Sequence, residues 1–90
     1  MALRYKSLEK ITKGVANHRR IQILELLLNK PELSLFEVSN ELGINMKTGS
    51  EHLRRLAAAG LVMKRYEGNM VRHRITKTAE AILKFLRILE

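Results

Sequence analysis

Residues 34–60 of the chain read SLFEVSNELGINMKTGSEHLRRLAAAG, and this stretch decides the fold. Ser34 and Glu37 have the spacing of a capping box, in which each side chain binds the backbone N–H of the other residue. The pattern therefore predicts a helix over residues 35–42, and Gly43 supplies the left-handed residue that ends it.

Asn45 caps a second helix, which is predicted over residues 46–59 and ends at Gly60 for the same reason as the first. Two short helices joined by a three-residue turn form a candidate helix-turn-helix. Because such corners also occur in proteins that bind no nucleic acid, the turn alone does not indicate function.

The flanking segments predict three more helices and a hairpin. Ser7, Asn17 and Thr76 are candidate N-caps, and residues 67–69 are typical of a hairpin turn. The helices are expected over residues 8–16, 18–29, 35–42, 46–59 and 77–89, and the strands over residues 61–66 and 70–75. This fold is mainly α with a small β-hairpin (α+β). Its order of four helices, two strands and a fifth helix is the winged helix-turn-helix arrangement.

The composition bounds the class of protein. Ninety residues support one domain over residues 1–90 and leave no room for two. The chain has no cysteine, which excludes disulfides and thiolate metal sites. It shows no membrane-spanning apolar run and no secretory signal, so a cytoplasmic location is expected. The three histidines fall in different elements, and no catalytic constellation or phosphate loop is present. The expectation is therefore no enzyme activity, no cofactor and no metal.

Charge is distributed unevenly along the chain. The formal net charge is +8, with 17 basic and 9 acidic side chains. Residues 1–30 and residues 47–74 are each strongly basic, and residues 31–46 between them hold three Glu and no base. This pattern is typical of a nucleic-acid-binding protein, although a soluble surface rich in lysine would also produce it.

The helix expected over residues 46–59 has two different faces. Met46, Gly49, Leu53, Leu56, Ala57 and Gly60 fall on the side expected to pack inward. The outward side is expected to carry Lys47, Thr48, Glu51, Arg54 and Arg55, with Ser50 and His52 at its edges. Lysine, threonine and arginine can form hydrogen bonds with base edges and phosphates. A glutamate can accept a hydrogen bond from a cytosine amino group. An ordinary solvated helix face is the alternative.

The hairpin that follows is also basic. Lys64, Arg65, Arg72, His73 and Arg74 place five basic or potentially basic groups on a short ribbon with a Gly-Asn tip. Such a ribbon next to a helix-turn-helix favours a DNA-binding wing over a surface hairpin that is basic by chance.

The sequence resembles the ArsR-type winged-helix transcriptional regulators, with some similarity to the MarR group. The likeness covers roughly residues 17–83, and residues 50–62, which resemble the pattern S-x-H-L-x-x-L-x-x-A-G-L-V, are its most specific part. Shorter likenesses lie at residues 17–27, 38–44 and 64–68.

The resemblance implies roles for particular residues. It places Lys47, Thr48, Ser50 and Glu51 near bases, His52 and Arg55 near phosphate, and Arg65, Asn69, Arg72 and Arg74 on the wing. The sequence departs from the family at Gly49, where an apolar branched residue is usual, so this helix is either loosely held or closely packed. It also lacks the cysteines of the family's metal sensors.

The last helix carries an apolar stripe that favours a homodimer, with the first helix assisting. Residues that recur at steps of four and three predict an interface on one side of this helix. The expected interface residues are Ile75, Ala79, Ile82, Leu83, Leu86 and Leu89. The alternative is that this helix covers only its own core.

Together these patterns predict a homodimeric regulator that binds double-stranded DNA sequence-specifically. A weakly specific architectural DNA-binding protein and a winged-helix protein-interaction module are the alternatives. No membrane association is expected, and the sequence does not indicate whether a small-molecule effector exists.

Overall fold

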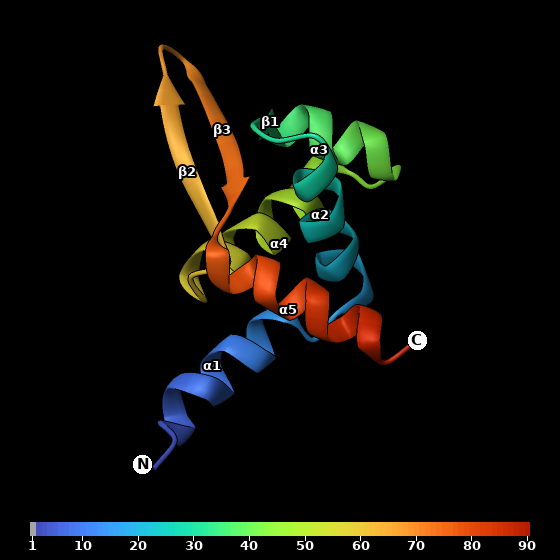
Figure 1. The fold of residues 1–90 in the computed structure, drawn as a ribbon. Helices are drawn as coiled ribbons and strands as arrows, with labels where there is room; N and C mark the ends of the chain where they lie inside the picture. The colour runs from blue at the N-terminus through green and yellow to red at the C-terminus, as the bar shows by residue number, and fades with distance from the viewer. Residues whose placement is uncertain (1) are drawn as a thin grey trace.

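The computed structural model describes residues 2–90 and follows the predicted order of elements with one addition (Figure 1). The added element is a two-residue strand, β1, before the third helix. The elements are α1 (Tyr5–Val15), α2 (His18–Asn29), β1 (Leu33–Ser34), α3 (Leu35–Leu42), α4 (Met46–Ala58), β2 (Val62–Glu67), β3 (Met70–Ile75) and α5 (Lys77–Ile88).

Local hydrogen bonds set the starts of four helices, as predicted. Asn17 accepts from two backbone N–H groups of α2, and Asn45 and Thr76 each accept from one in α4 and α5. The capping box is complete: Ser34 Oγ accepts from Glu37 N at 3.2 Å, and Glu37 Oε1 accepts from Ser34 N at 2.9 Å.

The predicted start of α1 is wrong. This helix begins at Tyr5, and Arg4 precedes it without a side-chain cap, so Ser7 lies inside the helix rather than at its end. No residue between Arg4 and Ser7 breaks a helix, so it extends further toward the N-terminus than the cap signal indicated. The other boundaries differ from the predictions by one residue at most.

The third strand makes the predicted hairpin part of a three-stranded sheet in the order β1-β3-β2. Leu33 pairs with His73 and Ser34 with Arg72. His73 Nδ1 also lies 2.9 Å from the carbonyl oxygen of Leu33. Because β1 is only two residues long, its sequence carries no alternation from which a strand could be predicted. It ties the wing to the start of α3.

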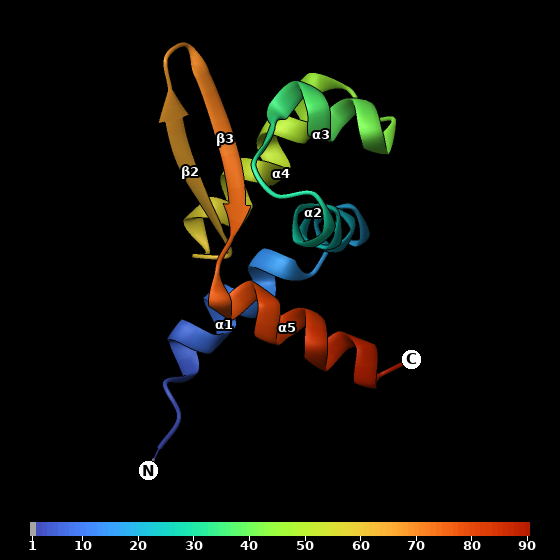
Figure 2. The ribbon, with the colours of Figure 1, turned by 45° about the horizontal axis from the view of Figure 1, so that its top comes forward.

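The core forms around α2, which lies between α3 and α5 (Figure 2). Helix α2 contributes three central buried side chains, those of Ile23, Leu24 and Leu27. The largest fully buried side chains are Ile23, Leu24, Leu27, Val38, Leu56 and Leu61. They hold α3, α4 and the base of the hairpin as one body, which fixes the position of the outward face of α4.

The glycine inside α4 marks a close helix crossing. A Cβ built on Gly49 would lie 2.4 Å from Ser39 Oγ and 3.2 Å from Leu35 Cδ1, both on α3. Ser39 is buried, and its hydroxyl has no hydrogen-bond partner among the described residues. The departure from the family pattern therefore reflects close packing of α3 on α4, and α4 is not loosely held at this point.

A second glycine brings α1 against α4, and this contact predicts a compensating pair of substitutions. A Cβ on Gly14 would lie 2.4 Å from Ala59 Cβ, which no side-chain rotation can move. Overpacking costs about 1–3 kcal/mol, and the better helix propensity of alanine offsets about 1 kcal/mol of it. Gly14→Ala is therefore expected to lower the free energy of unfolding by about 1 kcal/mol in urea titrations.

The matched control for that crossing is the exchanged pair. Ala59→Gly removes the obstructing methyl, so Gly14→Ala should be harmless or stabilising when introduced into the Ala59→Gly protein. Equal destabilisation by Gly14→Ala in both backgrounds would show that the two helices do not cross at this contact.

Candidate nucleic-acid interface

The outward face of α4 is exposed, as its pattern predicted. Lys47, Thr48, Ser50, Glu51, Arg54 and Arg55 are all exposed, and His52 is half-buried. Gly49, Leu53 and Leu56 on the opposite side are buried. Met46 was expected to pack inward but remains 45% exposed, because it occupies the first turn beyond the edge of α3.

One carboxylate lies within this face and is shared by two cations. Glu51 Oε1 is 3.3 Å from Arg55 Nη2 and 3.5 Å from Arg54 Nη2. Within residues 2–90, Lys47 has no carboxylate partner within salt-bridge distance. The first turn of α4 therefore carries a positive charge that no carboxylate among the described residues neutralises, at the place where major-groove readers position residues that contact base edges.

The register of the hairpin divides its cations between two faces. Arg65 pairs directly with Arg72, and Lys64 pairs with His73. Directly paired residues share a face of an antiparallel sheet. Lys64 and Ser50 line a groove of about 400 Å³ between the wing and α3 with α4. The wing and α4 thus present one continuous surface.

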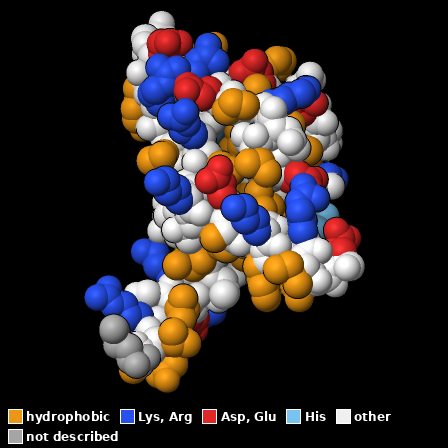
Figure 3. Space-filling view, in the orientation of Figure 1, with side chains coloured by type: hydrophobic (Ala, Val, Ile, Leu, Met, Phe, Trp, Pro, Cys, Tyr) orange, Lys and Arg blue, Asp and Glu red, His pale blue; other side chains and the backbone are white. Residues whose placement is uncertain are grey.

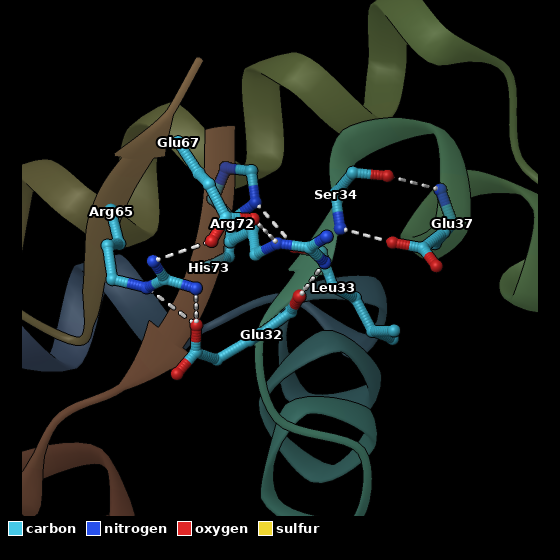
Figure 4. Close-up of polar contacts among 8 residues, drawn as sticks. All are labelled: Glu32, Leu33, Ser34, Glu37, Arg65, Glu67, Arg72 and His73. Carbon is cyan, nitrogen blue, oxygen red and sulfur yellow. Dashed lines mark hydrogen bonds and ion pairs between the residues drawn. The ribbon is translucent and has the colours of Figure 1, made fainter. Parts of the chain in front are cut away.

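Two of the three arginines on the other face, Arg65 and Arg72, are held by carboxylates (Figure 4). Arg65 Nε donates to Glu32 Oε1 at 2.7 Å, and its Nη1 lies 3.3 Å from Glu67 Oε2. Arg72 donates to Glu67 Oε1 at 3.1 Å and to the backbone oxygen of Glu32 at 3.1 Å. We call these four residues the wing cluster. It connects the hairpin to the segment before β1.

The wing cluster favours the ionised form of Glu67. Hydrogen bonds from Arg72 and then Arg65 lower the pKa of Glu67, and hydrogen bonds to Glu32 and then Glu67 raise the pKa of Arg65. Because exposed ion pairs are weakened by water and salt, a phosphate can compete for these arginines.

Sequence reasoning missed Glu32, because no local pattern links it to Arg65. The sequence pattern also counted His73 among the basic or potentially basic groups of the hairpin. In the structure His73 is 4% exposed and adds no charge to the wing surface. Burial lowers the pKa of His73, and its hydrogen bond with Leu33 opposes this only in part. Arg74 and Lys64 are exposed and, in the part of the chain that the structure describes, have no carboxylate partner.

Asn69 lies at the tip of the hairpin beside Gly68, whose positive φ of 62° makes the turn between β2 and β3. Figure 3 shows basic and acidic side chains together over the wing. The interface is therefore a mixed surface with local positive regions at α4 and at Lys64 and Arg74.

A family model described as the bacterial regulatory protein, arsR family, matches residues 17–64, more than half of the chain. The chain belongs to the ArsR family. The match spans the helix-turn-helix and the first part of the wing, so this ArsR-family transcriptional regulator has a winged-helix DNA-binding domain.

Curated relatives agree with that assignment. The transcriptional activator HlyU of Vibrio cholerae is 38% identical to this ArsR-family chain over 77 residues, which cover 84% of the chain and 70% of HlyU. The HTH-type transcriptional regulator Rv0324 of Mycobacterium tuberculosis is 38% identical over 66 residues, which cover 73% of the chain and 29% of Rv0324.

Solved structures share the fold. The homodimeric winged helix-turn-helix DNA-binding domain of Mb0332 from Mycobacterium bovis matches with a TM-score of 0.86 and 29% identity, over 94% of this ArsR-family chain and 79% of that one. HlyU from Vibrio cholerae matches with a TM-score of 0.84 and 33% identity, over 99% and 97% of the two chains.

The apolar stripe on α5 divides between core and surface in this ArsR-family chain. Ala79 and Leu83 are buried in the chain's own core, with Ile75 and Ile82 packed against it, so they offer little surface to a partner. Leu86 is half-buried and Leu89 is 64% exposed. The stripe therefore packs into the core at Ala79 and Leu83 and is exposed at its end, at Leu89.

Other kinds of site are not found in residues 2–90. No group of three His, Asp or Glu side chains there is arranged to hold a metal ion. No helix among those residues is long and apolar enough to cross a membrane.

Proposed function

We propose that this chain is a homodimeric transcriptional regulator that binds double-stranded DNA sequence-specifically in the cytoplasm. In this proposal α4 enters the major groove, where Lys47, Thr48, Ser50 and Glu51 contact base edges. The observation that carries the proposal is the exposed polar and basic face of α4, held rigidly by the core beside a wing that continues the same surface.

The remaining contacts are proposed to be with the DNA backbone or the minor groove. Phosphate contacts position a protein on DNA, and base contacts give specificity. His52, Arg54 and Arg55 flank the base-reading turn of α4. The proposed wing contacts are Lys64, Arg65, Asn69, Arg72 and Arg74.

The proposed dimer uses exposed apolar side chains of α1 and α5. Leu3 and Tyr5 are 66% and 73% exposed near the N-terminus, and Phe85 and Ile88 are 57% and 78% exposed on α5. The first half of α1 extends away from the body of the chain, with apolar side chains along it (Figure 3). Such apolar surface favours a partner, and the Mb0332 domain is homodimeric.

The test is retention of DNA from a pool of random duplexes at two salt concentrations, with sequencing of the retained fraction. A palindromic motif is expected, because a two-fold symmetric dimer binds two half-sites about one helical turn apart. Salt-sensitive retention without a motif would identify an architectural DNA-binding protein. No retention at low salt would favour a protein-interaction module.

Two substitutions on α4 separate base readout from backbone binding. Lys47→Ala and Glu51→Ala should each change the enriched motif, because a lost base contact costs about 1–3 kcal/mol at one position of the site. Arg74→Ala should weaken binding to all sequences similarly and reduce the salt dependence. If all three variants retain the wild-type motif, α4 does not read bases through Lys47 and Glu51.

A further inference from the structure

Arg20 on α2 is fixed between α1 and α4 by three contacts. Its Nε donates to the carbonyl oxygen of Gly14 at 2.7 Å, and its Nη2 lies 3.4 Å from that of Lys13. Its Nη1 lies 3.4 Å from His52 Nδ1 on α4. Carbonyls in the last turn of a helix lack intrahelical partners, and a cation there is stabilised by the helix dipole. The guanidinium is therefore oriented before any ligand is present.

This arrangement determines where the proton of His52 lies. A guanidinium donates hydrogen bonds and accepts none. The contact with Arg20 is therefore favourable only when His52 Nδ1 carries a lone pair, which places the ring proton on Nε2. An imidazolium at this position would put two cations face to face.

The surroundings favour the same neutral form. Partial burial, followed by the charge of Arg20, lowers the pKa of His52; Glu51 opposes this, and Arg55 and His18 add to it. These are the charged and titratable groups that act on the ring from α2 and α4. With the pKa below the ordinary value of 6.5, His52 is neutral at neutral pH.

His52 lines an open hollow of about 640 Å³ on the α2 side of α4. Arg20, Lys47 and Arg55 supply positive charge there, and Thr48 supplies a hydroxyl. One carboxylate, Glu51, also lines the hollow, but it is already shared by Arg54 and Arg55. The donors in this hollow are suited to the oxygens of a phosphate.

We propose that Arg20 is a positioning residue that holds His52 neutral, so that its Nε2–H group donates to a DNA backbone phosphate bound in this hollow. The inference rests on the proposed DNA binding and adds a residue outside the recognition helix and wing. It has a specific consequence for pH dependence: because the pKa of His52 lies below its ordinary value, the affinity that His52 contributes rises less between pH 8 and pH 6 than it would for an unperturbed histidine. A histidine free to become protonated would instead bind phosphate more tightly in acid.

The first part of the test uses the protein without DNA. The pKa of His52 is measured by NMR titration of its ring in the wild type, in Arg20→Gln and in Lys13→Gln. Lys13→Gln removes the same charge from a residue that contacts Glu9 and not His52. The His52 pKa should rise in Arg20→Gln and stay at its wild-type value in Lys13→Gln. An unchanged pKa in Arg20→Gln would overturn the positioning role.

The second part measures affinity for a random-sequence duplex at low salt, at pH 6 and at pH 8. Between pH 8 and pH 6, the wild type should gain less affinity relative to His52→Gln than Arg20→Gln gains relative to Arg20→Gln/His52→Gln. Arg20→Gln should gain about fivefold more affinity in acid than Arg20→Gln/His52→Gln, because a charge-assisted hydrogen bond is roughly twice as strong as a neutral one. Overall affinity is not the readout, since Arg20 also anchors α1.

The outcomes separate the two proposals. If the His52-dependent rise of affinity in acid is as large in the wild type as in Arg20→Gln, Arg20 does not hold His52 neutral and the inference is overturned. If the Arg20→Gln protein shows no His52-dependent gain, the phosphate contact is overturned. If the wild type binds no DNA at low salt, the proposed function and the phosphate contact both fail, while the His52 titration still decides whether Arg20 sets the state of the ring.

Discussion

Phe85→Lys is expected to convert the proposed homodimer into a monomer. Phe85 is 57% exposed on α5, close to Ile88 and Leu89, which are 78% and 64% exposed. A lysine at the centre of such a surface loses the apolar contact and buries a charge against the partner. A well-packed aromatic side chain contributes at least about 2 kcal/mol to an interface, so dissociation should become at least roughly thirtyfold easier.

Sedimentation equilibrium at micromolar concentration measures this change directly. Folding should be retained, because Phe85 lies outside the buried core. Glu80→Lys is the control: it also introduces a lysine on α5, at an exposed position on the polar side of the helix. A Phe85→Lys protein that remains dimeric would place the interface elsewhere, and a Glu80→Lys protein that dissociates would point to a general effect of charge.

Monomerisation should also weaken DNA binding. A dimer engages two half-sites with one loss of translational freedom, so the second contact benefits from a high effective concentration. The Phe85→Lys monomer should therefore bind a palindromic duplex little better than a single half-site. Equal affinity of monomer and dimer for the palindrome would contradict a symmetric dimer on DNA.

The features that could be predicted from the sequence are those set by short-range interactions. Asn17, Ser34, Asn45 and Thr76 each bind backbone N–H groups two or three residues away, so their helix starts are visible in the sequence. The same holds for Gly43, whose φ of 66° ends α3 as predicted. The helical period of α4 likewise predicted that Gly49, Leu53 and Leu56 are buried.

Features that depend on distant pairs could not be predicted. Strand β1 exists because Leu33 meets His73, forty residues further along the chain. The wing cluster exists because Glu32 reaches Arg65 from the segment before β1. The sequence predicted a basic hairpin. In the structure, two arginines of that hairpin are paired with carboxylates.

The apolar stripe on α5 could pack against the core of its own chain or against a partner. A stripe at steps of three and four indicates that one side of a helix is covered, but the pattern is the same for a core and for a partner. On α5 the stripe packs into the core at Ala79 and Leu83. The exposed apolar side chains are Leu89, at the end of the stripe, and Phe85 and Ile88 beside it. The candidate dimer surface shifts accordingly toward Phe85, Ile88 and Leu89.

Glu67→Gln is expected to tighten DNA binding about tenfold at low salt and to steepen its salt dependence by about one unit of slope. Glu67 pairs with both Arg65 and Arg72, at 3.3 Å and 3.1 Å. Its carboxylate both occupies two guanidinium groups and repels an approaching phosphate. An amide removes the negative charge while preserving the shape of the side chain.

Affinity for one duplex across a series of salt concentrations measures both effects. Glu41→Gln is the control of equal charge change, because Glu41 pairs with Lys30 at 2.9 Å outside the candidate interface. It should produce only the small gain that follows from net charge. If Glu67→Gln weakened binding instead, the carboxylate would be needed to hold Arg65 and Arg72 in position for phosphate, and it would not compete with DNA for them.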